Sequence, residues 1–277
     1  MQRKSELFRA EYSPMPTLTS PQITEANKLQ FQQKGYFILE NVLTGEELDH
    51  LRSFAADSIE RMHRRMDEEQ TDVIGLNRRN SRYFVGHSYR QSAGNYNFIF
   101  GPLMESIGRA TLGDTFNFFF DQYVIKAAEK GAHFSWHQDS GYVGFDHEPY
   151  ITCWVTLDDV SEENGTVYLL PFDKLGIRTR VEHIMDPQLN DKVGYFGDEP
   201  GVPVIAPAGS VAVFSSVCFH RSGANQTNQQ RRVLVCQYSK DGIVNPFTEE
   251  KKQNAIPFIE NGGRVVPGFE QGRESLR

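Results

Sequence analysis

The sequence has little cysteine, no excess of positive charge and no long apolar run. Three cysteines in 277 residues are too few for a disulfide scaffold. Cys153, Cys218 and Cys236 each lie in an apolar run, which predicts buried free thiols. A net charge of −7 argues against nucleic-acid binding, which needs a basic surface.

No apolar stretch is long enough to span a bilayer, and the first residues lack the apolar block of a signal peptide. Together these absences predict a cytoplasmic protein that binds neither membrane nor nucleic acid. Its 39% of hydrophobic residues, with 20 Phe and 11 Tyr, are enough to build a large core. We expect residues 1–19 to form a flexible arm and residues 20–277 a single domain.

Helical signals are confined to the N-terminal third. Ser20 and Pro21 predict the start of a helix that ends before Gly35. Thr44 and Glu47 have the spacing of a capping box, which predicts a second helix. Apolar residues then recur every three or four positions, typical of an amphipathic helix. A third, shorter helix is predicted from Pro102.

The apolar period changes to two from Phe116 onward. This alternation predicts five strands, at Phe116–Ala127, Tyr150–Val160, Thr166–Leu170, Ser210–Ser216 and Arg232–Ser239. Turn residues separate the strands and no helical pattern intervenes, so an antiparallel sandwich or barrel is expected. The fold class is therefore mainly β (α+β), with a jelly-roll core at about 116–240 and flanking N-terminal helices. Residues 72–100 show no clean period, and the tail from Pro246 is expected to be irregular.

Two short segments carry candidate metal ligands. His137 and Asp139 are two residues apart, so on a strand both side chains point to the same side. His220 follows the apolar run 211–219; a lone histidine there is more often packed in the core. Two histidines and one carboxylate are nevertheless the facial ligand set of non-haem Fe(II) oxygenases, which leaves three coordination positions open.

An arginine stands eleven residues after His220. We expect a two-strand hairpin to bring Arg231 back beside His220. Arg231 could then bind one carboxylate of a dicarboxylic co-substrate whose other end chelates the metal. Arg232 is adjacent, and alternation allows only one of the two to face a cavity. Alternatively, both arginines are solvated at the edge of the hairpin.

Several runs together resemble the phytanoyl-CoA dioxygenase family. His133–Tyr142 resembles its iron-binding segment, and Cys153–Asp159 with Glu163–Thr166 resembles the strand and turn that follow. Pro207–Ser210 and Phe219–Asn225 resemble the segment of its distal histidine. The resemblance is dense over about residues 116–240 and weaker over 20–60.

The resemblance implies a cupin-like double-stranded β-helix that binds Fe(II) through His137, Asp139 and His220. It implies 2-oxoglutarate as co-substrate on Arg231, and O₂ as oxidant. Further co-substrate contacts are implied at Ser222, Gln138, Trp154 and Gln122. The implied reaction is hydroxylation of a small molecule with release of succinate and CO₂. Related halogenases have a small residue where Asp139 stands, so oxygenation is expected here.

The substrate is left open at this point. The same iron site could catalyse desaturation, cyclisation or epoxidation in natural-product biosynthesis, or the jelly roll could be a non-catalytic binding protein. Four arginines could bind an anionic substrate or form a solvated basic face: Arg78, Arg79, Arg82 and Arg90. Lys126 is a weaker candidate contact, because a lysine that ends a strand is usually solvated. We expect His133 and His147 to lie outside the ligand set. The chain is expected to be a monomer or a homodimer.

Overall fold

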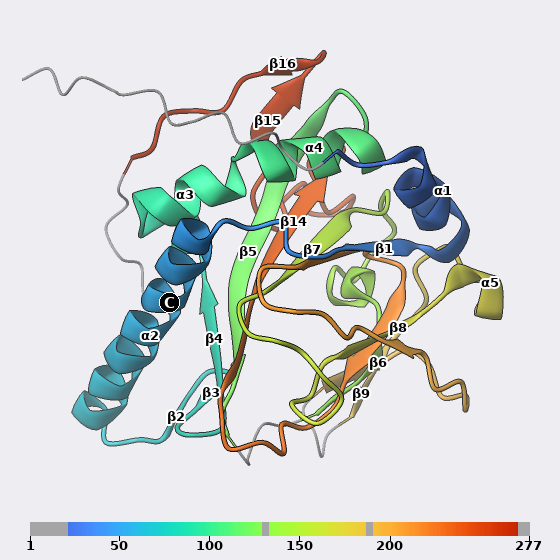
Figure 1. The fold of residues 1–277 in the computed structure, drawn as a ribbon. Coiled ribbons are helices and arrows are strands. Elements are labelled where there is room, and N and C mark those ends of the chain that lie inside the picture. The colour runs from blue at the N-terminus through green and yellow to red at the C-terminus, as the bar shows by residue number, and fades with distance from the viewer. Residues whose placement is uncertain (1–21, 129–132, 187–190, 271–277) are drawn as a thin grey trace, which may run out of the picture.

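The computed structural model describes residues 22–128, 133–186 and 191–270 (Figure 1). The arm expected at residues 1–19 lies outside the described residues. The helices are α1 (Glu25–Lys34), α2 (Gly45–Glu68), α3 (Ala93–Ile99), α4 (Pro102–Thr111) and α5 (Phe172–Leu175). Two 3₁₀ turns, η1 (Ser88–Arg90) and η2 (Asp139–Tyr142), complete the helical elements. Within these ranges, no helix combines the length and apolarity needed to cross a bilayer.

The first two helices begin at capping boxes. Thr44 accepts a hydrogen bond from the Glu47 amide, and Glu47 reaches back to the Thr44 amide, as the sequence predicts. Helix α1 begins after Thr24, later than the expected start at Ser20–Pro21, because Thr24 and Asn27 form the same reciprocal cap. Gly35 ends α1 in the left-handed conformation.

A large antiparallel sheet forms the centre of the molecule. Its strands follow the order β1 (Tyr36–Leu39), β12 (Val211–Ser215), β7 (Ile151–Thr156), β14 (Arg231–Ser239), β5 (Phe116–Lys126), β4 (Arg82–Gly86), β3 (Asn77–Arg78) and β2 (Val73–Ile74). Strand β15 (Ile256–Glu260) pairs with the start of β5 and with β16 (Gly263–Arg264). The expectation of an irregular tail is wrong here, because Phe258 is fully buried in the core.

A smaller sheet contains β11 (Val202–Pro203), β8 (Val167–Leu170), β13 (Phe219–Ser222) and β6 (Phe134–His137), in that order. Strands β9 (Ile184–Asp186) and β10 (Asp191–Val193) form a separate pair. The predicted hairpin between residues 220 and 231 is wrong. Strand β13 pairs with β6 and β8, whereas β14 pairs with β5 and β7 in the large sheet.

The two faces of the large sheet have different neighbours. One face packs against α2, α3 and α4 in a core that includes Leu51, Phe54 and Ile107 (Figure 1). The other face packs against the small sheet through a second apolar cluster that includes Trp154, Leu169 and Phe214. Two opposed antiparallel sheets confirm the predicted jelly roll, and the space between them contains the candidate site.

Candidate metal centre and its cavity

The structure brings the three predicted ligands together between the sheets. His137 ends β6, Asp139 begins η2, and His220 lies on β13, directly opposite His137 in the register of the small sheet. One ligand atom from each residue lies within 4.8 Å of the other two. This is the only such cluster of three His, Cys, Asp or Glu side chains in the part of the chain that the structure describes.

Backbone carbonyls orient both imidazoles. His137 Nδ1 lies 2.7 Å from the Ser135 carbonyl oxygen, and His220 Nδ1 lies 3.1 Å from the Cys218 carbonyl oxygen. A carbonyl can only accept, so each Nδ1 carries a proton, and in the neutral imidazole it is Nε2 that keeps the lone pair. His220 Nε2 is 3.5 Å from Asp139 Oδ1. Two imidazole nitrogens and one carboxylate are thus oriented toward one point, which fits a first-row metal ion.

Two polar side chains of the large sheet hold the Asp139 carboxylate. Thr152 Oγ1 donates to Asp139 Oδ2 at 2.5 Å, and Gln237 Nε2 donates to the same oxygen at 3.1 Å. Gln237 also donates to Thr152 Oγ1. Because Oδ2 is occupied, Oδ1 is the oxygen available on the histidine side. Such outer hydrogen bonds fix the orientation of a metal ligand.

The charged groups of the triad shift one another's pKa values. Burial opposes ionisation of Asp139, but attraction to His220 and His137 and the Thr152 hydrogen bond outweigh it and lower the pKa to about 2. Burial, reinforced by His220, lowers the pKa of His137 to about 4. A carboxylate and a neutral imidazole are the protonation states that bind a metal ion.

The triad opens into a cavity of about 450 Å³ between the two sheets. Side chains of alternate residues on the large sheet form its wall, so Gln122, Trp154, Val235 and Gln237 all line it. A bulge in β5 opposite residues 237 and 238 interrupts the alternation. Phe119 and Phe120 therefore both line the cavity, despite being adjacent in sequence.

The end of the cavity near Arg231 is strongly positive. Arg231 and Lys126 are directly paired across β14 and β5, and both side chains are buried. Burial lowers the pKa of Arg231 to about 10 and, with the neighbouring Arg231 charge, that of Lys126 well below its usual value. Neither forms an ion pair with a described carboxylate. Two desolvated cations side by side are stabilised by an anion bound between them.

Hydrogen bonds to protein groups satisfy only part of the Arg231 guanidinium. Arg231 Nη2 donates to the Gly165 carbonyl oxygen at 3.0 Å, but its Nε and Nη1 are buried without a partner. Lys126 Nζ donates to Ser222 Oγ at 2.8 Å and to the Gly223 carbonyl oxygen. Gly165 has φ +76°, and a Cβ there would lie 2.5 Å from the Gly223 carbonyl oxygen. A glycine is therefore needed where this turn approaches the two cations.

The other predicted contact residues fall into two groups. Ser222, Trp154 and Gln122 line the cavity, and the guanidinium of Arg231 lies 5.5 Å from the Trp154 ring centroid. Gln138 is buried elsewhere. Its side chain donates to the carbonyl oxygens of Thr179 and Val217 and accepts from the Val181 amide. The structure therefore does not bring Gln138 to the cavity with the other residues.

The sequence gives little or no sign of three residues of the site. Lys126 is only a weaker candidate contact from the sequence, because a lysine that ends a strand is usually solvated, yet it is fully buried. Its inward direction follows from sharing parity on β5 with Val124 and Gln122, so the alternation was the available signal. Thr152 and Gln237 were not singled out, because a polar residue within a strand gives no sign of which carboxylate it contacts.

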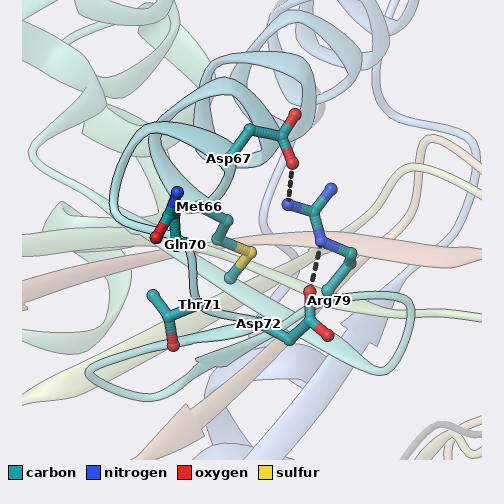
Figure 2. A pocket seen from close by; sticks show the side chains of 6 residues that line it. All are labelled: Met66, Asp67, Gln70, Thr71, Asp72 and Arg79. Atoms are coloured by element: carbon teal, nitrogen blue, oxygen red, sulfur yellow. Dashed lines mark hydrogen bonds and ion pairs between the residues drawn. The ribbon is translucent and has the colours of Figure 1, made fainter.

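The four arginines of residues 78–90 have separate environments. Arg79 joins Asp67 at 2.5 Å and Asp72 at 2.7 Å at the end of α2, which neutralises its charge (Figure 2). Arg90 donates to the Tyr89 hydroxyl, and Arg78 is exposed. Arg82 alone of the four lines the cavity. The cluster is therefore not one basic face.

Two further histidines lie outside the triad, as expected. His133 is exposed, and His147 contacts Ser140 Oγ at 3.1 Å. The three buried cysteines are free thiols, which confirms that prediction.

Comparison with known proteins assigns a family to this geometry. A model of the family described as Phytanoyl-CoA dioxygenase (PhyH) matches residues 31–233. A curated relative, the L-proline trans-4-hydroxylase of Streptomyces griseoviridis, is 22% identical over 164 residues, or 50% of this chain and 60% of that protein. The matched regions cover at most 60% of the curated relatives' own lengths.

Solved structures agree with the fold. EctD from S. alaskensis, crystallised with 2-oxoglutarate and 5-hydroxyectoine, superposes with a TM-score of 0.65 at 18% identity and covers 94% of this chain and 90% of its own. SnoK, a non-heme alpha ketoglutarate dependent carbocyclase from nogalamycin biosynthesis, has a TM-score of 0.61 at 18% identity and covers 79% and 85%. At these identities the similarity establishes the jelly-roll fold.

Proposed function

Because the chain belongs to the phytanoyl-CoA dioxygenase family, we propose that it is an Fe(II)- and 2-oxoglutarate-dependent dioxygenase that hydroxylates a small organic molecule. In the balanced reaction, substrate, 2-oxoglutarate and O₂ give hydroxylated substrate, succinate and CO₂. One observation carries the proposal. A set of two histidines and one carboxylate shares a cavity with a buried arginine that has two donor nitrogens without a partner among the described residues.

Three residues form the proposed metal site. His137, Asp139 and His220 would hold Fe(II), with both Nε2 atoms freed by the carbonyls that bind Nδ1. Bound Fe(II) supplies open coordination positions for 2-oxoglutarate and O₂ and the oxidising chemistry itself. Thr152 and Gln237 keep the Asp139 carboxylate turned toward the histidines.

The positive end of the cavity positions the co-substrate. Arg231 Nε and Nη1 keep unpartnered N–H donors that a carboxylate accepts, and Lys126 adds a second basic group. The distal carboxylate of 2-oxoglutarate binds here, while its other end faces the triad. Ser222 and Trp154 line the same region. The buried wall around these groups excludes water, which strengthens each charged contact.

A second outcome at the same site is a different oxidation, such as ring closure or desaturation. Its support is the fold shared with the carbocyclase SnoK. The metal and co-substrate residues serve both reactions equally, so the cavity wall around the substrate decides between them.

The direct test is turnover of 2-oxoglutarate by the purified protein with Fe(II) and O₂. We expect formation of succinate that requires the metal, and increased succinate in the presence of substrates from a small-molecule library. A product 16 mass units heavier than its substrate indicates hydroxylation, whereas loss of two hydrogens indicates desaturation or ring closure. Absence of succinate under all conditions, with 2-oxoglutarate bound, would leave a binding protein and overturn the proposal.

A further inference from the structure

A third cation continues the positive row across the large sheet. In the sheet register, Arg82 of β4 is directly opposite Lys126 of β5, which in turn is opposite Arg231 of β14. Residues paired in this way point to the same face. Since adjacent strands lie about 4.8 Å apart, the backbones of Arg82 and Arg231 are about 10 Å apart. All three side chains line or adjoin one cavity, and Arg82 is 8% exposed.

The charge of Arg82 has no counterion among the described residues. Arg82 Nε donates to the Leu76 carbonyl oxygen at 3.1 Å, while its two terminal nitrogens bond to no described group. Its guanidinium lies 5.8 Å from the ring centroids of both Phe84 and Phe134. The two rings hold the guanidinium in place but do not neutralise it.

The cavity carboxylate outside the triad, Asp191, is already engaged. Asp191 Oδ2 accepts from the Ser135 amide at 2.8 Å, and Oδ1 accepts from the Tyr142 hydroxyl at 2.7 Å. Asp191 forms no ion pair with Arg82 within 4.0 Å, although its charge acts on Arg82 from farther away. Arg82, buried beside two rings and without a counterion among the described residues, contrasts with Arg79, which two aspartates neutralise (Figure 2).

2-Oxoglutarate would leave Arg82 without an anion. On the assignment made above it places one carboxylate at the metal and the other at Arg231 and Lys126, so neither carboxylate is assigned to Arg82. Arg82 bonds to the backbone of Leu76, an exposed residue that also lines the cavity, so its guanidinium is at a part of the cavity that reaches solvent.

We propose that Arg82 binds an oxyanion, a carboxylate or a phosphonate, of the organic substrate. This inference rests on the proposed function and adds the substrate class to it. The anion binds the terminal nitrogens of Arg82 beside Phe84 and Phe134, and the rest of the molecule follows the aromatic wall inward toward the metal. The anionic group of the substrate lies at Arg82 and its reacting carbon lies at the triad. The distance between these two sites therefore sets the separation of the two groups within the substrate. Arg82 acts as a specificity residue that selects an organic acid over its neutral analogue.

The test compares matched anionic and neutral probes. The full chain, loaded with redox-inert Zn²⁺ and saturated with 2-oxoglutarate, is titrated by calorimetry with phenylacetate, phenylphosphonate and the neutral phenylacetamide. We expect at least one acid to bind at least about tenfold more tightly than the amide, because a charge-assisted hydrogen bond from Arg82 to an oxyanion is stronger than one to a neutral amide carbonyl. Which of the two acids binds more tightly distinguishes a carboxylate from a phosphonate.

Variants of Arg82 and of the neighbouring Arg78 test whether Arg82 itself selects the anion. Arg82→Met retains an apolar stem beside the two rings and should lose the preference for the acids while still binding 2-oxoglutarate. Arg82→Gln provides a polar replacement in case the Met variant misfolds. Arg78→Met is the matched control, because Arg78 is opposite Arg82 on β3 but exposed, and it should retain the preference.

Two results would overturn this inference. Equal binding of acids and amide by the parent protein would show that the cavity does not select an oxyanion. An unchanged preference in both Arg82 variants would show that another residue selects it. Failure of the parent protein to bind 2-oxoglutarate would instead contradict the proposed function. The probe titrations without 2-oxoglutarate would then still decide whether Arg82 binds an anion.

Discussion

Each imidazole of the triad is oriented toward the metal position by one backbone carbonyl. Metal binding therefore depends on each histidine side chain individually. For His220 that carbonyl belongs to Cys218, and the imidazole is buried. His220→Ala should therefore weaken Zn²⁺ binding by more than about 100-fold, because loss of a ligand costs more than loss of an outer hydrogen bond. Metal titration measures this directly. His50→Ala, an exposed position on α2, should bind Zn²⁺ normally; equal affinity of the two variants would remove His220 from the ligand set.

The two adjacent arginines provide a matched pair. Arg231 lines the cavity, whereas Arg232 contacts Asp158 on the opposite face through bonds of 2.9 and 2.6 Å. Arg231→Met should raise the 2-oxoglutarate dissociation constant roughly 30- to 1000-fold with metal still bound, since a buried charge-assisted contact is lost. Arg232→Met should lower stability but leave that constant nearly unchanged. The reverse pattern would place the co-substrate on the other face of β14.

At the residue scale, the sequence predicts which residues form the site better than it predicts which way their side chains point. The ligand triad follows from spacing and chemistry. Alternation alone cannot choose between Arg231 and Arg232, because both faces of β14 are mostly apolar. Gln138 is adjacent to two ligands in sequence, yet its side chain turns toward Thr179 and Val217. That direction depends on the residue 179–181 segment packing nearby, a contact between distant parts of the chain.

At the scale of elements, β7 supports the metal site from the opposite sheet. Thr152 and Thr156 lie on the same face of β7, but Thr152 donates to Asp139 and Thr156 donates to the Pro207 carbonyl oxygen. Thr152→Val should lower metal affinity about 10- to 100-fold by releasing the carboxylate. Thr156→Val should cost stability without changing metal affinity. Equal metal affinities would show that Gln237 alone orients Asp139.

Strand β5 is joined to η1 by a buried acid. Asp121 is fully buried, and its Oδ2 accepts from the Ser88 amide at 2.7 Å, while Oδ1 has no partner among the described residues. Burial raises its pKa to about 6, above about 3.9 in the unfolded chain. The folded state therefore binds more protons between these values. The stability that Asp121 contributes is present below about pH 4 and is lost as the pH rises to about 6.

Asp121→Asn should remove this dependence. Relative to the parent protein, the variant should gain up to about 3 kcal/mol of unfolding free energy between pH 4 and pH 7, the equivalent of about two pKa units. Denaturant unfolding at the two pH values measures the gain. Asp57→Asn, at an exposed position on α2, serves as the control. A constant difference between parent and Asp121→Asn across this range would contradict an elevated pKa.

Elements with local signals were predictable, and elements that depend on distant pairing were not. The capping box at Thr44 and the alternation on β5 follow from a few consecutive residues. Strands β2 to β4 have no clean period, because they form by adding to the edge of β5. Strand β15 forms against the same edge. The hairpin predicted after His220 is wrong because a loop between residues 222 and 231 can cross between sheets as easily as close within one.

At the scale of the whole molecule, the site is divided between two sheets. The three metal ligands belong to the small sheet and the turn that follows β6, whereas Arg231 and Lys126 belong to the large sheet. A 2-oxoglutarate molecule held at both ends would therefore connect the two sheets across the cavity. A ligand that binds only the folded state stabilises it by RT ln(1 + [L]/Kd), which rises with the logarithm of the free ligand concentration.

This division predicts coupled stabilisation. Zn²⁺ alone should raise the melting temperature, and 2-oxoglutarate should raise it further only when the metal is bound. At 100 times its dissociation constant a ligand adds about 2.7 kcal/mol, or roughly 5–10 °C for a domain of this size. Thermal unfolding with and without a chelator measures both steps. In Asp139→Ala the metal step should disappear, and in Arg231→Met only the 2-oxoglutarate step should. An equal 2-oxoglutarate shift in Arg231→Met and the parent protein would show that the co-substrate does not join the two sheets.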